Sequence, residues 1–234
     1  MSASLVGSEM CIRDRAYVAE VADQALTTQA ADIEAFLAEE SKAEAGKTVK
    51  EALDGKIAVI GENLNIRRFS KMAAEDGFVA SYIHAGGKIG VLVHVATDVV
   101  NDEIKEMGKN VAMQVAAIAP KYTSRDEVSK DYIDHETEIL KIQAKNENPD
   151  KPDNIIEKMI IGRLNKELKE VCLLDQAYVK AEDGKQAVGK YVEQVAKANG
   201  ANVTIKEFVR FETGEGIEKK EENFAEEVAK QMGN

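Results

Sequence analysis

The strongest alternating pattern of the chain lies in residues 60–95, and it constrains the fold more than any other feature. From Ile89 to Val95, isoleucine and valine occupy every second position. This period of two is typical of a strand with one buried face. Residues 64–69 and 78–84 alternate less regularly, and two adjacent glycines at 86–87 permit a tight hairpin turn. We therefore predict three consecutive strands in an antiparallel meander.

Most of the remaining chain shows the three-to-four-residue spacing of amphipathic helices. Thr48 and Glu51 have the spacing of a capping box, Gly61 ends the helix that they begin, and a second such spacing at Ser124 predicts another helix start. Residues 202–211 form a further predicted strand. The predicted helices cover residues 16–37, 48–60, 98–119, 124–145, 155–171, 188–199 and 217–232.

The order of these elements indicates an α+β fold. Two helices joined by a short turn near residues 182–184 predict an antiparallel helical hairpin over residues 152–199. The helix of residues 124–145 has few apolar residues, so we expect it on the surface. One sheet segment with helices, followed by helices with one strand, indicates two unequal halves that divide between residues 97 and 109.

The charge and cysteine content argue against several classes of protein. The chain has 31 Lys and Arg against 42 Asp and Glu, a formal net charge of −11. This opposes nonspecific binding to nucleic acid, in which cationic side chains replace counterions on phosphates. No stretch approaches the roughly 20 apolar residues of a membrane-spanning helix. Cys11 and Cys172 lack metal-binding spacing, and we expect a reducing cytoplasm without a disulfide.

The sequence offers no constellation of catalytic or metal-ligating residues. His84, His94 and His135 have no partner at metal-ligand spacing, although His84 and His94 could approach each other from neighbouring strands. Residues 86–88 lack the remainder of a phosphate-binding loop. We therefore expect no catalytic residue, no cofactor and no metal. The remaining interpretation is that the protein functions by binding other molecules through its surface.

Two adjacent arginines, Arg67 and Arg68, stand on a predicted strand. Neighbouring strand residues point to opposite faces, so at least one of them is expected at the surface. The sequence leaves open whether these arginines form a structural ion pair or contact a partner.

Four separated segments together resemble the elongation factor Ts family. They are IGENLNIRR at residues 60–68, SYIHAGGKIGVLV at 81–93, NVAMQVAAIAPKY at 110–122 and FVRFETGEGIEKKEENFAEEVA at 208–229. All four stand in the family's order with compatible gaps, which is more specific than any single motif. The resemblance extends from about Ala16 to the C-terminus.

The resemblance implies an α+β core of two similar subdomains, each a small antiparallel sheet with helices, a protruding antiparallel helical hairpin and a C-terminal helix. We therefore expect a core N-subdomain at 16–107, a core C-subdomain at 108–216 that includes the hairpin at 152–199, and a C-terminal helical module at 217–234. Residues 1–15 look non-native, because SEMCIRDR is similar to translated sequencing adapter. We leave them out of fold reasoning.

In this family the protein is not an enzyme. It is the guanine-nucleotide exchange factor of elongation factor Tu in translation elongation. The resemblance implies that this chain, in a bacterial cytoplasm, binds elongation factor Tu in its GDP-bound and nucleotide-free forms and promotes GDP release by binding the nucleotide-free GTPase. The implied partner-binding residues are Lys88, Ile89, Gly90, Asn110, Met113, Gln114, Ile217, Phe224 and Val228. Many family members have histidine where this chain has Gln114, so that contact is expected to differ in detail.

Two further expectations follow from the comparison with the family pattern. The family carries a Thr-Asp-Phe-Val motif and an N-terminal domain upstream of the Ala16 helix, and neither is found in this sequence. We therefore expect impaired exchange with binding partly retained. Ile155, Ile156 and Met159 leave open a homodimer through the helical hairpin.

The alternatives are a ribosome- or RNA-associated helical-hairpin scaffold without exchange activity, and a small-molecule enzyme with a site at His84 and His94. The net charge of −11 and the lack of a basic, aromatic-rich face disfavour the scaffold. A stoichiometric transition metal would favour the enzyme. We expect no membrane partner and no direct contact with nucleic acid.

Overall fold

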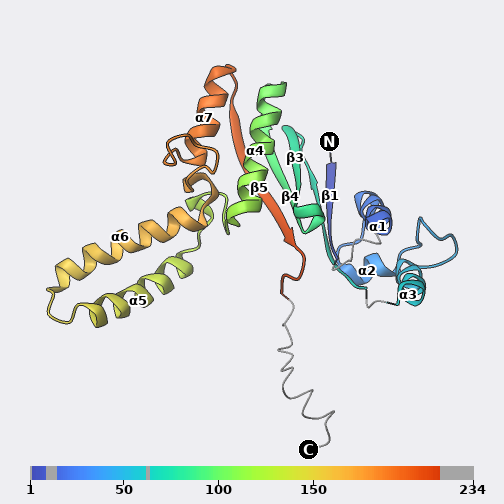
Figure 1. Ribbon diagram of the computed structural model, residues 1–234, viewed down its shortest axis with the longest axis horizontal. Coiled ribbons are helices and arrows are strands. Elements are labelled where there is room, and N and C mark those ends of the chain that lie inside the picture. The colour runs from blue at the N-terminus through green and yellow to red at the C-terminus, as the bar shows by residue number, and fades with distance from the viewer. Residues whose placement is uncertain (1, 9–14, 62–63, 217–234) are drawn as a thin grey trace, which may run out of the picture.

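The computed structural model describes residues 2–8, 15–61 and 64–216, which form small antiparallel sheets surrounded by helices (Figure 1). The strands are β1 (Ser2–Ser8), β2 (Ile66–Ala73), β3 (Gly77–His84), β4 (Ile89–Thr97) and β5 (Val203–Glu212). The helices are α1 (Arg15–Thr27), α2 (Ile33–Ala38), α3 (Val49–Ile60), α4 (Asp102–Ile118), α5 (Lys130–Glu147), α6 (Asp153–Val171) and α7 (Val188–Ala198). The predicted α+β class is confirmed. The predicted C-terminal helix lies outside the described residues.

β4 is the central strand of a three-stranded antiparallel sheet, with β3 on one side and β5 on the other. Val91, Val93 and Val95 are fully buried on one face of β4, and Leu92 on the opposite face is 1% exposed. A strand buried on both faces has no access to water for its backbone groups, so it pairs along both edges.

The predicted meander is right for two strands and wrong for the third. β3 and β4 form the predicted hairpin, but β2 pairs antiparallel with β1 and not with β3. The third place in the sheet belongs to β5, which is more than a hundred residues away in the chain. Residues 1–15, which we left out of fold reasoning, contribute β1 as the partner of β2.

α4 packs along β3 and β4 because its apolar residues share one face. Its fully buried apolar residues are Ile104, Met107, Val111, Ala112 and Val115. Gly108 permits the close approach, since a Cβ there would lie 3.0 Å from the Phe78 ring and 3.1 Å from the Cβ of Ala80. α7 adds Val188 and Val192 to the same core.

The start and end predicted for α3 are confirmed, whereas α5 begins at a different residue from the predicted one. Thr48 and Glu51 form the predicted capping box, and Gly61 ends α3 with a left-handed φ of 77°. Ser124 precedes only a short 3-10 helix, Arg125–Glu127, and its side chain forms no cap hydrogen bond. The continuous helix predicted from Ser124 is therefore wrong, because α5 begins later, where the Ser129 side chain accepts a hydrogen bond from a first-turn amide. No described helix is both long enough and apolar enough to cross a membrane.

The protruding helical hairpin consists of α5 and α6 (Figure 1). The predicted hairpin at 152–199, which pairs α6 with the helix now labelled α7, is therefore wrong. Leu140 and Ala144 of α5 pack against Ile156 and Ile160 of α6, so the few apolar residues of α5 suffice for one narrow seam. The loop of residues 148–152 is short enough to impose the antiparallel order. α7 packs against α4 instead.

The hydrophobic clusters of the described residues separate between β2 and β3. α1, α2, α3 and β2 share a cluster around Phe36, whereas β3, β4 and β5 share another with α4 and α7. The predicted boundary at residues 107–108 falls inside α4, which is one continuous helix. Because a cut there would divide the main core, the packing favours a division at residues 74–76.

Gly77, at the start of β3, offers a test of the close sheet packing. A Cβ at this position would lie 2.1 Å from the carbonyl oxygen of Val95 and 2.9 Å from the amide nitrogen of Thr97. Because these obstacles are backbone atoms, we expect Gly77→Ala to lower the free energy of unfolding by about 1–3 kcal/mol in urea denaturation. The control Gly55→Ala in α3 meets no atom within 4 Å and is expected to raise it by up to about 1 kcal/mol. Equal stability of the two variants would contradict the packing.

Candidate partner-binding surface

The predicted partner-binding residues fall on three parts of the chain. The first group, at the start of β4, is Lys88, Ile89 and Gly90. The second group, on α4, is Asn110, Met113 and Gln114. The third group, which lies outside the described residues and stays a prediction, is Ile217, Phe224 and Val228.

The turn between β3 and β4 is exposed, and a residue that follows β5 forms hydrogen bonds with the backbone of this turn. Residues 85–87 all have positive φ angles, of 49°, 68° and 103°, a region that favours the glycines found at two of the three positions. Lys88 is exposed, whereas Ile89 and Gly90 are partly buried. The carbonyl oxygen of Lys88 accepts hydrogen bonds from the amide of Thr213 at 2.8 Å and from its hydroxyl at 3.1 Å. The Lys88 side chain is therefore presented on a fixed backbone.

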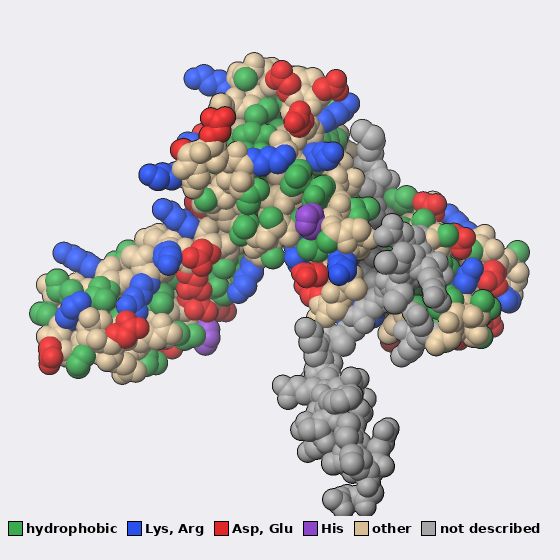
Figure 2. All heavy atoms as spheres, viewed as in Figure 1, with side chains coloured by type: hydrophobic (Ala, Val, Ile, Leu, Met, Phe, Trp, Pro, Cys, Tyr) green, Lys and Arg blue, Asp and Glu red, His purple; other side chains and the backbone are tan. Residues whose placement is uncertain are grey.

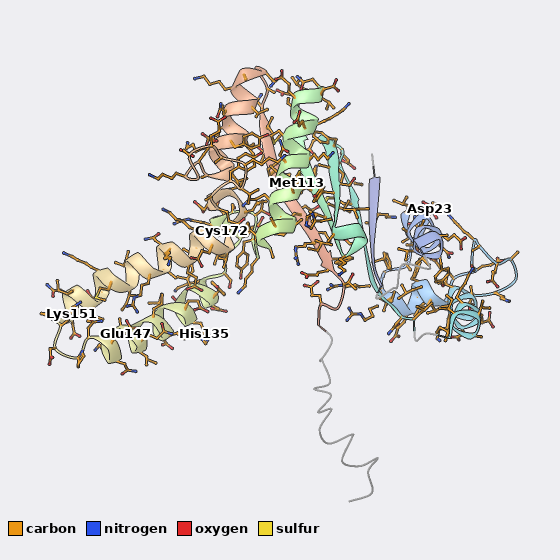
Figure 3. The ribbon with its side chains drawn as sticks, in the orientation of Figure 1. Asp23, Met113, His135, Glu147, Lys151 and Cys172 are labelled. Carbon is orange, nitrogen blue, oxygen red and sulfur yellow. The ribbon has the colours of Figure 1, made fainter. Side chains whose placement is uncertain are left out.

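The second half of α4 lies towards the same end of the sheet as this turn. α4 begins just after β4 ends, where Asn101 Nδ2 donates to Asn199 Oδ1 at 2.7 Å, and it then runs back along β3 and β4. Met113 is partly buried in this second half of the helix (Figure 3). Ile118, the last residue of α4, is 47% exposed. Met113 therefore lies towards the end of the sheet at which Lys88 is found.

Asn110 points into the protein, contrary to the predicted contact with a partner. Its side chain is 8% exposed. Asn110 Nδ2 donates to Tyr191 Oη at 2.9 Å, and Asn110 Oδ1 accepts from Lys180 Nζ at 2.8 Å. The reason is a second buried flank of α4, which is covered by α7 and by the loop that precedes it.

Gln114 lies on the same flank and is fully buried, so its predicted contact with a partner is also replaced by internal bonds. Its Nε2 donates to Gln176 Oε1 and to the carbonyl oxygen of Ala177, both at 3.1 Å. Its Oε1 accepts from the amide of Val179 at 2.8 Å. Gln176 Nε2 in turn donates at 2.7 Å to the carbonyl oxygen of Glu170, near the end of α6. The network joins α4 to the base of the hairpin.

A signal for this network is present in the sequence. Gln114 is the one polar residue in the otherwise apolar run of residues 111–119. A lone polar side chain inside an apolar helical run is expected to be buried and hydrogen-bonded. Its partners at 176–179 follow some sixty residues later, and no local pattern identifies them.

Two residues that the sequence left undecided, Arg67 and Arg68 of β2, both bind the turn that follows β5. Arg68 Nη2 lies 2.5 Å from Glu215 Oε2, and Arg67 Nη2 donates to the carbonyl oxygen of Glu215 at 3.0 Å. Burial raises the pKa of the Glu215 carboxyl, but the hydrogen bonds from Arg68 and from the Glu212 amide outweigh it and hold the pKa below its usual value. The structural ion pair that we considered is present, and it lies next to Lys88.

The two histidines considered for a shared metal lie on opposite faces of the sheet. His84 shares the α4 side with Tyr82, whose Oη lies 2.9 Å from His84 Nδ1. His94 lies on the other face, with its Nε2 2.9 Å from Asp76 Oδ1, and this hydrogen bond lowers the pKa of Asp76. The register places them five positions apart as well. Across the described part of the chain, no group of three His, Cys, Asp or Glu side chains could hold a metal.

Gln114→Leu tests the buried network. The change leaves the Val179 amide and the Ala177 carbonyl without their partner in a buried site, so we expect the free energy of unfolding to fall by about 1–3 kcal/mol. The neighbouring Met113→Leu conserves volume and is expected to cost less than about 1.5 kcal/mol. Both are measured by chemical denaturation. A Gln114→Leu variant as stable as Met113→Leu would contradict the role of the network.

Comparison with known proteins identifies the family of this chain. The family model described as Elongation factor TS matches residues 15–215. The elongation factor Ts of Clostridioides difficile (strain 630) is 54% identical over 218 residues, which cover 93% of this chain and 70% of that protein. The elongation factors Ts of Clostridium botulinum (strain Eklund 17B / Type B) and Clostridium perfringens (strain 13 / Type A) are 49% and 46% identical with the same coverage. The chain therefore belongs to the elongation factor Ts family of translation elongation factors.

Proposed function

We propose that this chain is a guanine-nucleotide exchange factor of elongation factor Tu, which promotes GDP release by binding the nucleotide-free GTPase in the bacterial cytoplasm. Membership of the elongation factor Ts family carries the proposal. In this proposal the chain is not an enzyme, because it makes and breaks no covalent bond. It changes only the relative stability of two states of its partner.

The physical basis of such exchange is differential binding. A factor that binds the nucleotide-free GTPase more tightly than the GDP form must weaken the affinity of the GTPase for GDP by the same ratio. Each tenfold of this ratio corresponds to about 1.4 kcal/mol. A modest surface that fits one state better than the other is therefore sufficient, and no catalytic group is needed.

The contact surface that we propose includes the Lys88–Gly90 turn and Met113. The exposed Lys88 side chain supports this assignment, together with a glycine-containing backbone that a partner can approach closely. Hydrophobic, basic and acidic side chains are interspersed on the face of the molecule that Figure 2 shows around α4. Asn110 and Gln114 contribute indirectly in this proposal, because they fix the loop and α7 against α4.

The hairpin of α5 and α6 is assigned no role in exchange. The homodimer through this hairpin stays a prediction. Of the residues that suggested it, Ile156 is 2% exposed and fills the seam within the chain, whereas Ile155 is 39% exposed.

Release of a fluorescent GDP analogue from elongation factor Tu in stopped flow tests the proposal. We expect the chain to accelerate release. Lys88→Glu reverses the charge of an exposed contact and is expected to reduce the acceleration about tenfold, equivalent to about 1.4 kcal/mol. The control Lys105→Glu changes an equally charged, exposed residue in the first half of α4, and it is expected to leave the rate unchanged.

Two different failures are distinguishable in this experiment. If the chain neither accelerates release nor binds elongation factor Tu, the proposed function is wrong, and a helical-hairpin scaffold becomes the better explanation. If the chain accelerates release but Lys88→Glu behaves as Lys105→Glu does, the function stands and the assignment of the Lys88 surface is wrong.

A further inference from the structure

Tyr82 and His84 stand two positions apart on the same face of β3, and their side chains are in contact. Tyr82 Oη lies 2.9 Å from His84 Nδ1, and the centroids of the two rings are 5.8 Å apart. Tyr82 is partly buried against the main core, whereas His84 is exposed. An exposed imidazole is therefore held by a side chain that is itself anchored in the core.

The backbone at His84 is fixed on both sides. His84 is the last residue of β3 and pairs with Ile89, the first residue of β4. Ala85 follows with a φ of 49°, and it is one of two residues other than glycine with a positive φ in the described ranges. Alanine keeps such a conformation only where its surroundings specify it, and such positions concentrate at functional sites. Both the backbone and the ring of His84 are thus specified, although the residue lies outside the core.

His84 borders the proposed contact surface. Residues directly opposite each other in an antiparallel pair share a face, with Cβ atoms about 4.5–5.5 Å apart, so His84 and Ile89 are neighbours. The exposed Lys88 stands at the other end of the same turn. The residues between His84 and Lys88 are one alanine and two glycines. No long side chain therefore separates these two residues from an approaching protein.

The hydrogen bond between the two rings determines what His84 offers to a partner. A phenol hydroxyl is a stronger donor than a neutral imidazole N–H, and an imidazole nitrogen is a stronger acceptor than a phenol oxygen, so the Tyr82 hydroxyl is expected to donate to Nδ1. A neutral imidazole carries one proton, which then lies on Nε2. Within the described part of the chain, Nε2 forms no hydrogen bond. It is therefore a donor directed at the surroundings.

We propose that His84 binds elongation factor Tu directly, by donating a hydrogen bond from Nε2 to an oxygen atom of that protein, and that Tyr82 positions the imidazole for this contact. This inference rests on the proposed function, since the partner is elongation factor Tu. The His84 donor and the positive charge of Lys88 flank one turn, so the surface that fits them is rich in carbonyl or carboxylate oxygens. Tyr82 is a positioning residue and does not itself contact the partner.

A purely stabilising role explains the pair of rings less well. A hydrogen bond between side chains at the surface replaces bonds to water, so its net contribution to folding is small. Replacement of the exposed His84 is therefore expected to leave the midpoint of urea unfolding unchanged. A pair that serves a contact changes the affinity for the partner instead.

Two isosteric replacements of His84 test the contact in the full chain. The amide nitrogen of glutamine reaches approximately the place of the imidazole Nε2, whereas that of asparagine reaches only the place of Nδ1. We expect His84→Asn and His84→Ala to weaken binding to nucleotide-free elongation factor Tu about tenfold, and His84→Gln to weaken it less than about threefold. The control His135→Ala removes an exposed histidine of α5 and is expected to bind as the wild type does.

Two results of this series would overturn the proposal. Equal losses for His84→Gln and His84→Asn would show that Nε2 is not the contacting atom. Wild-type affinity in all three His84 variants would show that this residue makes no contact with elongation factor Tu.

Tyr82→Phe, alone and combined with His84→Ala, tests the positioning role. We expect the loss of the hydroxyl to weaken binding about threefold in the wild-type background and to have no effect once the imidazole has been removed. An equal loss in both backgrounds, or no loss in either, would overturn the positioning role. The matched control Tyr132→Phe deletes a hydroxyl that donates to Glu167 Oε1 at 3.0 Å between α5 and α6, and it is expected to leave the affinity unchanged.

A measurement on the free chain separates failure of this geometry from failure of the proposed function. The NMR chemical shifts of the His84 ring nitrogens, measured with the ring neutral, report which nitrogen carries the proton. We expect the proton on Nε2, and an Nδ1 resonance that moves in Tyr82→Phe. A proton on Nδ1, or nitrogen shifts that Tyr82→Phe leaves unchanged, overturns the proposal even if the wild-type chain binds elongation factor Tu. If the wild-type chain does not bind, the proposed function is wrong and the contact falls with it.

Discussion

The burial of α4 on two sides is the constraint on which the main core depends. One face of the helix packs on β3 and β4, where Gly108 permits close contact, and a second flank is covered by α7 and the loop before it. The second flank buries two polar side chains, Asn110 and Gln114, whose amide nitrogen and oxygen atoms all form hydrogen bonds within the chain. Each of these buried amides would cost about 1–3 kcal/mol without its partners.

Prediction from sequence succeeded where the structure depends on residues that are close together in the chain. Local rules identified the β3–β4 hairpin, the Thr48–Glu51 capping box and the Gly61 helix end, because each depends on residues within a few positions. The apolar face of α4 was equally readable from its spacing. What the spacing could not supply was the identity of distant partners, such as β5 beside β4, Gln176 beside Gln114 and Glu215 beside Arg68. The hairpin was misplaced because the turn predicted near residues 182–184 is only part of the long connection, residues 172–187, between α6 and α7. The short loop of residues 148–152 joins α5 to α6 instead, and packing shows that α7 belongs to α4.

The prediction of the site shows the same division. Lys88 was expected at the surface and is exposed there, whereas Asn110 and Gln114 were expected at the surface and are internal. The resemblance to the family carries a residue's position along the chain but not the direction in which its side chain points. In the proposed exchange factor, the internal residues hold the scaffold and the Lys88 turn meets the partner.

Calorimetry of this chain with elongation factor Tu, with and without saturating GDP, tests whether the chain distinguishes the two states of the GTPase. We predict that GDP weakens binding of this chain, and that the ratio of the two affinities equals the loss of GDP affinity when this chain is bound, as linkage requires. Equal affinity for the GDP-bound and nucleotide-free GTPase would contradict it, because a protein that does not distinguish the two states cannot shift their equilibrium.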